Sequence, residues 1–367
     1  MEPPLKGEWQ PTAPLVRSVA TASVLALAAL VLGSPDLLVL AAPFGLLAAL
    51  GLAHAPRGPL TGRVRVADRW LHEGQSTHLQ VLAEAPQALE QVTATLAPPA
   101  YVVVQPPSGA LSWTPTGAED SAVVDFAISS RRWGVRPAGS ATVAATTPWC
   151  GYRWGPQRLP DATLVTLPET RRFASGENPH PVGLIGQNRS RRGGDGSEFF
   201  AIRPFQPGDR LRRVNWRTTL RTGEVHAIGT SAQEDSAVLI LLDAVTDVGA
   251  SGGIDGAASS LDVSVRAASA LAAHHVRVGD RVALRVLGRT GQVLVPGSGL
   301  RHQRRLQELL AQVQPGWPEV LGTRHLRLRT GAGTIVVVLS PLLTPEITTV
   351  MVTLARRGLS VVCVDTL

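Results

Sequence analysis

Two apolar runs near the start of the chain constrain its fold more than any other feature. Ser18–Pro35 carries no charged residue, and Leu37–Ala53 is apolar throughout. Each run is close to the lower limit of about 17–25 residues that a helix needs to span a bilayer. The turn at residues 33–36 (Gly-Ser-Pro-Asp) has the residue types that end helices and reverse a chain. We predict an N-terminal transmembrane helical hairpin, with two helices over residues 18–54.

A cleaved signal peptide is the alternative interpretation of the same runs. Residues 53–55 (Ala-His-Ala) resemble a cleavage site of small residues. The apolar region, however, is far longer than the roughly 7–15 residues of a signal sequence, and Asp36 interrupts it. These two features favour the hairpin.

Basic residues flank the outer ends of the two runs, whereas the turn between the runs carries only the acidic Asp36. The basic residues are Lys6, Arg17, Arg57, Arg63, Arg65 and Arg69. Because cytoplasmic flanks of membrane helices are rich in Lys and Arg, we predict that both ends of the chain face the cytosol. The expected protein lies in the cell membrane, with a cytoplasmic tail over residues 1–17 and cytoplasmic soluble domains after residue 57.

The composition of the chain after the two apolar runs changes twice, which divides it into three regions. Residues 60–168 hold several short β-branched runs divided by Pro, Gly and Ser, which is typical of an antiparallel β-sandwich. Residues 169–231 are rich in glycine, polar residues and arginine, and we predict a linker and surface segment there. Residues 232–367 alternate apolar strands with amphipathic helices, which predicts an open α/β sheet with its functional edge at the carboxyl ends of the strands.

The net charge of the chain is concentrated in one segment. The whole chain carries +7, from 35 Lys and Arg against 28 Asp and Glu, and residues 186–221 alone hold nine arginines against three acids. With 44% hydrophobic and 17% charged residues, the chain is neither disordered nor a polytopic transporter. The two cysteines, Cys150 and Cys363, are far apart and give no disulfide framework or metal motif.

Residues 196–221 form a distinctive stretch, GSEFFAIRPFQPGDRLRRVNWRTTLR, which we call the signature segment. It resembles the signature of the bacterial family called domain of unknown function 58, in which a Glu-Phe pair, an Arg-x-aromatic, a Pro-Gly-Asp, an Arg and an Asn-Trp recur in this order. The upstream Arg132-Trp133-Gly134 also resembles an element of that family. The resemblance makes these the candidate binding residues: Glu198, Arg203, Pro207, Gly208, Asp209, Arg212, Asn215, Trp216 and Arg221.

The resemblance implies a fold and a partner for this chain. It implies that residues 232–367 form a von Willebrand factor A-like domain, and that the protein is a companion of a MoxR-type AAA+ ATPase. The sequence has no phosphate-cradling P-loop, and its one Gly-x-Ser-x-Gly pattern, at residues 249–253, lies too far from a strand-to-helix turn to be a nucleophile elbow. We expect a non-enzymatic interaction or adaptor protein.

Two interpretations of the signature segment remain open. In the favoured one it is a scaffold, in which Trp216, Phe199 and Phe205 pack and Arg203 or Arg212 satisfies Asp209 or Glu198. In the other it contacts a partner directly. Anionic lipid or nucleic acid bound by the cluster from Arg189 to Arg221 is a further alternative, and nucleic acid is disfavoured because the segment lacks alternating aromatics and a DNA-reading motif.

A divalent cation is the cofactor that a von Willebrand A-like domain implies. Hard cations need about six oxygen ligands, which such a domain supplies from an Asp-x-Ser-x-Ser loop and two further loops. Here the loop reads Asp243-Ala-Val-Thr-Asp247, the later strand ends in Ser340-Pro341, and Ser298 is a possible stand-in for a threonine ligand. Asp243 and Asp247 are the candidate ligands of a degraded Mg²⁺ site. We therefore expect no cofactor, and a metal-dependent ligand binder is the alternative.

Overall fold

The computed structural model describes residues 7–86, 88–114, 121–170, 193–206, 209, 211–231, 237–289, 291–317 and 334–367. Of residues 121, 193–201 and 229–231 it describes the backbone. The chain forms two compact units. Unit 1 consists of residues 1–168 with 253–256, and unit 2 of residues 169–252 with 257–367.

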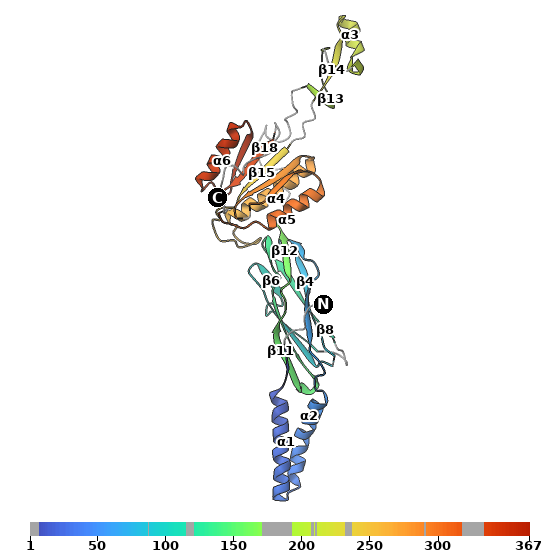
Figure 1. Ribbon diagram of the computed structural model, residues 1–367, viewed down its shortest axis with the longest axis vertical. Coiled ribbons are helices and arrows are strands. Elements are labelled where there is room, and N and C mark those ends of the chain that lie inside the picture. Colours follow the sequence, from blue (N-terminus) through green and yellow to red (C-terminus); the bar gives the residue numbers. More distant parts are fainter. Residues whose placement is uncertain are drawn as a thin grey trace. The chain divides into compact units, whose positions relative to one another are not determined.

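Unit 1 contains two long apolar helices. α1 (Ala13–Leu32) and α2 (Asp36–Ala53) run side by side and are joined by a tight turn (Figure 1). Gly33 ends α1 in the left-handed conformation that favours glycine. Both helices are long and apolar enough to cross a bilayer, and their large side chains, such as Leu30 and Val39, are mostly exposed. The prediction of two apolar helices of spanning length is confirmed.

Two antiparallel sheets enclose the core of unit 1. One has the strand order β1-β11-β10-β5-β7 and the other β2-β4-β8-β6. Their strands are β1 (Trp9–Pro11), β2 (Thr61–Val66), β4 (Ser76–Glu84), β5 (Gln91–Ala97), β6 (Val102–Gln105), β7 (Ala110–Trp113), β8 (Ser121–Ser130), β10 (Ser140–Thr146) and β11 (Tyr152–Arg158). Alternate residues of both sheets point inward and build one core that includes Leu79, Phe126, Val143 and Trp154. This is the two-layer arrangement that the sequence predicts for residues 60–168.

A smaller sheet and a short helical turn complete unit 1. The sheet has the order β3-β12-β9, formed by β3 (Trp70–His72), β9 (Gly134–Pro137) and β12 (Thr163–Leu167). The turn η1 (Pro148–Cys150) lies between β10 and β11. Residues 9–11, which the sequence places in a tail, instead form β1 and pair with β11 directly before α1 begins. The hairpin of helices is thus joined to the sandwich by a strand as well as by its C-terminal connection.

The signature segment in unit 2 forms a hairpin. β13 (Gly193–Pro204) and β14 (His226–Ser231) pair antiparallel, and the connection between them contains η2 (Leu211–Arg213) and α3 (Trp216–Thr222) (Figure 1). Within the described part of this hairpin, the buried apolar side chains are Val214 and Ala227. The support of α3 therefore comes mainly from hydrogen bonds.

The rest of unit 2 is an α/β sheet with the strand order β17-β16-β15-β18-β19. Its elements are β15 (Ala237–Asp243), α4 (Ser260–Val278), β16 (Arg281–Leu287), β17 (Val293–Gly297), α5 (Leu300–Ala311), β18 (Ile335–Ser340), α6 (Pro345–Arg356) and β19 (Ser360–Asp365). Four strands are parallel and β17 is antiparallel to β16. The apolar face of α6 packs on Leu239, Leu241 and their neighbours, and α4 contacts the same strands, whose alternate residues such as Ile240 are also buried. Both faces of the sheet are covered, which explains its uninterrupted apolar strands.

Candidate functional site

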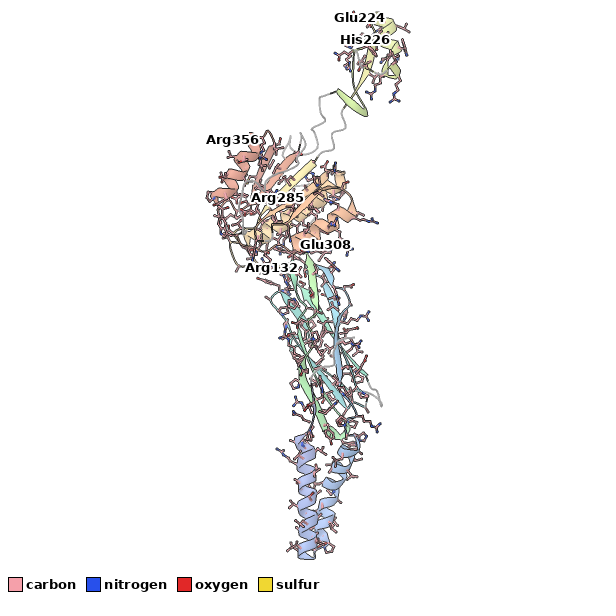
Figure 2. The ribbon with its side chains drawn as sticks, in the orientation of Figure 1. Arg132, Glu224, His226, Arg285, Glu308 and Arg356 are labelled. Carbon is pink, nitrogen blue, oxygen red and sulfur yellow. The ribbon has the colours of Figure 1, made fainter. Side chains whose placement is uncertain are left out.

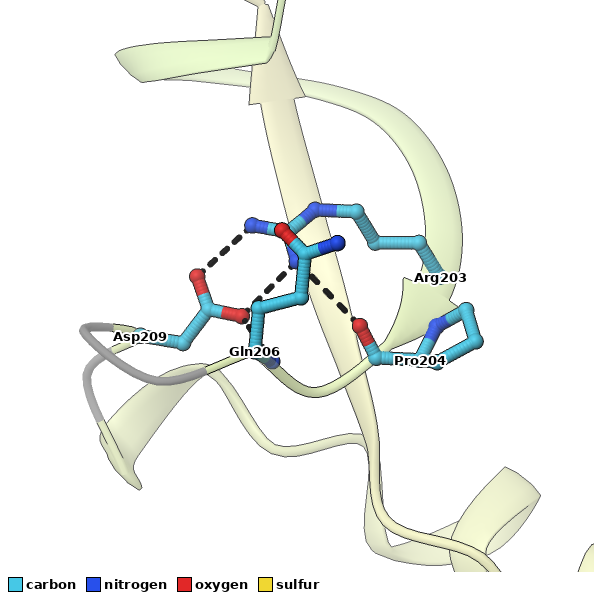
Figure 3. Close-up of polar contacts among 4 residues, drawn as sticks. All are labelled: Arg203, Pro204, Gln206 and Asp209. Atoms are coloured by element: carbon cyan, nitrogen blue, oxygen red, sulfur yellow. Dashed lines mark hydrogen bonds and ion pairs between the residues drawn. The ribbon is translucent and has the colours of Figure 1, made fainter.

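The signature segment is braced by an ion pair between Arg203, near the end of β13, and Asp209 in the loop that follows. The two terminal nitrogens of Arg203 donate to the two carboxylate oxygens of Asp209 at 2.6 and 2.8 Å (Figure 3). The carboxylate also accepts the backbone N–H of Gln206 at 2.9 Å, and Arg203 donates to the carbonyl of Pro204 at 3.2 Å. The bond from Arg203, followed by that from Gln206, lowers the pKa of Asp209. A bidentate pair of this kind fixes direction as well as distance, so the loop has a defined shape.

A second set of hydrogen bonds positions α3. The side-chain oxygen of Asn215 accepts the backbone N–H of Thr218 at 3.2 Å and caps the helix. Thr219 Oγ1 donates to the carbonyl of Asn215 at 2.9 Å and accepts the backbone N–H of His226 at 3.1 Å, which ties α3 to β14. His226 Nδ1 lies 2.8 Å from the carbonyl oxygen of Glu224, beside the helix (Figure 2). Asn215 and Thr219 hold the helix in place.

The side chains that α3 turns outward are apolar and cationic. Trp216 is 64% exposed and Leu220, one turn later, is 84% exposed. Residues four apart share a helix face, so the two side chains form one apolar surface, which we call the Trp216–Leu220 patch. Three exposed arginines belong to the same short stretch, namely Arg212, Arg217 and Arg221. Trp and Arg are the side chains most enriched where proteins bind each other tightly.

The structure divides the candidate residues by role. Arg203 satisfies Asp209, as the scaffold interpretation expects, and Asn215 is a helix cap. The expectation that Trp216 packs is wrong, because its side chain is 64% exposed on a seven-residue helix that is held by its caps and by Thr219. Phe205 is half-buried. Arg212 and Arg221 are exposed and therefore available to a partner.

Some candidate residues lie outside the description. Only the backbone of Glu198 and Phe199 is described, and both belong to β13. Pro207 and Gly208 lie outside the described residues, as do Arg189, Arg191 and Arg192.

Leu211 and Leu220 are exposed residues of the segment that the sequence reasoning missed. Their signal was present in the sequence. Leu220 stands four residues after Trp216, and both leucines interrupt a strongly basic run in which an apolar residue has little core to enter.

The candidate metal ligands lie at the carboxyl end of the α/β sheet and are engaged within the protein. Asp243, at the end of β15, is 2% exposed, and its Oδ2 accepts the hydroxyl of Ser340 at 2.6 Å. Its Oδ1 accepts the backbone N–H of Val245 at 3.0 Å. Asp247 Oδ1 accepts the backbone N–H of Leu261 at 3.1 Å, in the first turn of α4. Both carboxylates thus make the internal bonds that a loop and a helix start require.

The remaining expected ligand is at the wrong edge of the sheet. β17 runs antiparallel to β16 and Gly297 pairs with Val282, near the amino end of β16, so Ser298 follows at the amino edge. Asp243 pairs with Leu287 at the opposite, carboxyl edge. Thr246 Oγ1 is a buried oxygen without a hydrogen-bond partner, but one spare hydroxyl does not make a six-oxygen site. Within the described residues no three His, Cys, Asp or Glu side chains group as metal ligands. The residues present do not fit a divalent cation.

Comparison with known proteins identifies one region of the chain. Residues 201–366 match the model of the family described as protein of unknown function DUF58. Among solved structures, the chain is similar to the cupredoxin domain of amoB from Nitrosocaldus yellowstonii, with 8% identity, coverage of 33% of this chain and 95% of that chain, and a TM-score of 0.19. It is also similar to the human F-spondin reeler domain (fragment 2), with 10% identity, coverage of 29% and 86%, and a TM-score of 0.18. Likenesses this weak support no inference. No curated protein matches the chain.

Proposed function

Because this chain belongs to the DUF58 family over residues 201–366, we propose that it is a membrane-anchored, non-enzymatic adaptor that binds a protein partner through the Trp216–Leu220 patch. The observation that carries the proposal is the exposure of Trp216 and Leu220 on a short helix that hydrogen bonds hold rigid. A preorganised aromatic side chain loses little conformational entropy on binding, so most of its burial energy remains available for affinity.

The chemistry of the patch specifies the surface that it would bind. A tryptophan buries about 150–250 Å² when it enters a pocket. Arg212, Arg217 and Arg221 are exposed in the same stretch and favour carboxylates at the rim of that pocket. The complementary partner surface is an apolar pocket bordered by Asp and Glu. On the family resemblance, we assign that surface to a MoxR-type AAA+ ATPase.

The anchor consists of α1 and α2. Their large apolar side chains are exposed, whereas the core helix of a soluble protein buries such side chains. The pairing of α1 with α2, and the strand β1 that fixes the start of α1 to β11, favour a retained hairpin over a cleaved signal peptide. With Lys6, Arg17 and Arg57 at the outer ends, the soluble domains face the cytoplasm of a bacterial cell.

The α/β sheet is the second half of the adaptor. Its central β15, flanked by β16 and β18 and followed by a loop that starts at Asp243, supports a von Willebrand factor A-like domain. On this proposal the domain works without a cation, because the Ser340 hydroxyl and the backbone N–H of Val245 occupy the carboxylate of Asp243.

The test is a titration of the purified full-length chain in detergent micelles with the purified ATPase. If Trp216 is a binding hot spot, Trp216→Ala weakens the affinity by about 2 kcal/mol or more, which is roughly 30-fold. Leu220→Ala lowers it less. The matched control is Trp317→Ala, which removes another exposed tryptophan from unit 2 and should leave the affinity unchanged. Equal affinities for the wild type and Trp216→Ala would refute the patch as the binding site.

Anionic lipid remains the alternative ligand of the exposed arginines, and liposome co-sedimentation distinguishes it from protein. Lipid binding through Arg212, Arg217 and Arg221 would fall steeply with salt and would tolerate Trp216→Ala. Protein binding through an apolar pocket would depend less on salt and would weaken in Trp216→Ala.

A further inference from the structure

The turn between β10 and β11 holds two residues in an unusual conformation. Trp149 and Cys150 in η1 have φ angles of 61° and 49°, in the left-handed region that residues with a side chain rarely adopt. The surrounding bonds hold them there. Two hydrogen bonds between Thr147 and Tyr152 close the turn: the Thr147 N–H donates to the Tyr152 carbonyl at 2.9 Å, and the Tyr152 N–H donates to Thr147 Oγ1 at 3.0 Å. The Cys150 N–H donates to Glu90 Oε2 at 2.8 Å. The result is that Trp149 points away from the core and is 54% exposed.

This turn lies directly against the ends of both apolar helices. Thr12, the N-cap of α1, donates its backbone N–H to the carbonyl of Gly151 at 3.0 Å and its hydroxyl to the carbonyl of Cys150. On the other helix, a Cβ placed on Gly151 would lie 2.7 Å from the carbonyl oxygen of Gly51, in the last turn of α2. Backbone therefore meets backbone where α1 begins and where α2 ends. Trp149 is fixed at the level where the chain enters and leaves the two spans.

Basic residues lie near that level. Arg17 is exposed on α1, five residues beyond Thr12 and so about 7.5 Å along the helix. Arg153 is exposed on β11 and pairs with Gln10 of β1, two residues before Thr12. Tryptophan is enriched at membrane interfaces because its ring is apolar and its N–H is polar, and Arg at the ends of spans reaches phosphate headgroups. The combination has the chemistry of the lipid headgroup layer.

We propose that the turn 148–151 is a third membrane contact, in which the indole of Trp149 enters the headgroup layer beside the ends of α1 and α2. The contact rests on the proposed anchoring of α1 and α2. It goes beyond anchoring, because it holds the sandwich at a fixed height and orientation on the bilayer. The occupant is lipid because the turn is continuous with the spans. Cys150 is not a competing explanation, because burial and the neighbouring Glu90 raise the pKa of its thiol and disfavour a reactive thiolate.

The experiment reconstitutes the full-length chain into phosphatidylcholine vesicles that contain about 20% phosphatidylglycerol, so that the membrane surface is anionic. Flotation first reports whether the wild-type chain is held by the bilayer. Brominated lipids then quench tryptophans that lie at or below the headgroups. Because the chain has eight tryptophans, the contribution of Trp149 is the difference in quenching between the wild type and Trp149→Phe.

We expect Trp149→Phe to lose a measurable part of the quenchable emission. The control Trp70→Phe, which removes another exposed tryptophan of unit 1, should leave quenching unchanged. A floating protein whose quenching is the same with and without Trp149 overturns the contact while leaving the anchor intact. A wild-type chain that fails to float overturns the anchor and the contact together.

A second measurement does not depend on the folding of the Trp149 variant. In Cys363→Ser, the exposed Cys150 is the one remaining cysteine and can carry a bimane fluorophore attached at alkaline pH, where the thiol ionises despite its raised pKa. Quenching of this label by the same brominated lipids supports the contact, and an unquenched label in floated vesicles refutes it.

Discussion

The buried bond between Ser340 and Asp243 offers the sharpest test of how the α/β sheet satisfies its buried carboxylate. Ser340 Oγ donates to Asp243 Oδ2 at 2.6 Å, and neither residue is more than 2% exposed. The bond joins the carboxyl ends of β18 and β15, which are neighbours in the sheet. Ser340→Ala removes the donor, keeps the volume nearly constant and leaves a buried carboxylate with one bond fewer.

The expected cost follows from the burial and the charge. A hydrogen bond to a charged group contributes about 1.5–3 kcal/mol, and leaving such a group unsatisfied in the interior adds the loss of its solvation. The hydroxyl also accepts the backbone N–H of Leu342 at 2.9 Å, but Leu342 is exposed and water can replace that bond. We therefore expect Ser340→Ala to destabilise the α/β sheet by about 2–3 kcal/mol.

Amide hydrogen exchange of the full-length chain in micelles measures this cost where it arises. For amides that exchange through opening of the sheet, 2–3 kcal/mol corresponds to exchange about 30- to 140-fold faster in β15 and β18. The strands of unit 1 should be unaffected. Ser360→Ala, at the exposed amino end of β19, is the matched control and should change exchange little. A change of less than about threefold in Ser340→Ala would refute the view that this bond stabilises the sheet.

Three further outcomes follow from the same structure. Arg203 lowers the pKa of Asp209, so the carboxylate contributes stability at pH values above its ordinary pKa of about 4, and this contribution is lost as the pH falls through the lower pKa of the folded state. NMR titration should show that the pKa of Asp209 rises in Arg203→Met. An unchanged pKa would contradict the ion pair. Gly151→Ala places a Cβ 2.7 Å from the carbonyl oxygen of Gly51 in α2 and should lower the stability of this region by about 1–3 kcal/mol. The loss should appear as faster amide exchange in β1 and β11. In the control Gly45→Ala the new Cβ meets nothing within 4 Å, so stability should not change. Calorimetric titration of the full-length chain with Mg²⁺ should give no binding heat up to millimolar concentration, and micromolar affinity would contradict the assignment of Asp243 as internally satisfied.

Those parts of the fold that depend on periodicity could be predicted from the sequence. The two apolar helices follow from uninterrupted runs bounded by turn residues, and the α/β sheet follows from apolar strands that alternate with amphipathic helices. These patterns persist over many residues, so a local exception does not obscure them. The strand β1 could not be predicted in this way, because its three residues have no period and it forms only through pairing with β11, far along the chain.

The candidate metal site shows a different limit of sequence-based prediction. The sequence predicts a degraded ligand set around Asp243, because an oxygen-poor loop is visible in the residue types. It left Ser298 open as a ligand, since the direction of the strand before Ser298 is a property of pairing and not of composition. Only the antiparallel register of β17 places Ser298 at the far edge of the sheet. Likewise, the hydrogen bond from the Ser340 hydroxyl to Asp243 forms only because two residues that are 97 positions apart become neighbours.

The orientation of Trp149 and Trp216 is least accessible to sequence reasoning, for a shared physical reason. Hydrophobicity alone assigns Trp149 and Trp216 to a core, because burial of a large aromatic is favourable. In both places, backbone hydrogen bonds decide the direction of the side chain. The closed turn around η1 forces φ above zero at Trp149, and the Asn215 cap and Thr219 bonds fix a seven-residue helix with one face left outside. Exposure alone does not mark a binding site, because Trp70 and Trp317 are exposed as well. What sets Trp149 and Trp216 apart is the local hydrogen-bond network that fixes each of them, and we propose lipid at Trp149 and a protein at Trp216 as the partners that complete their burial.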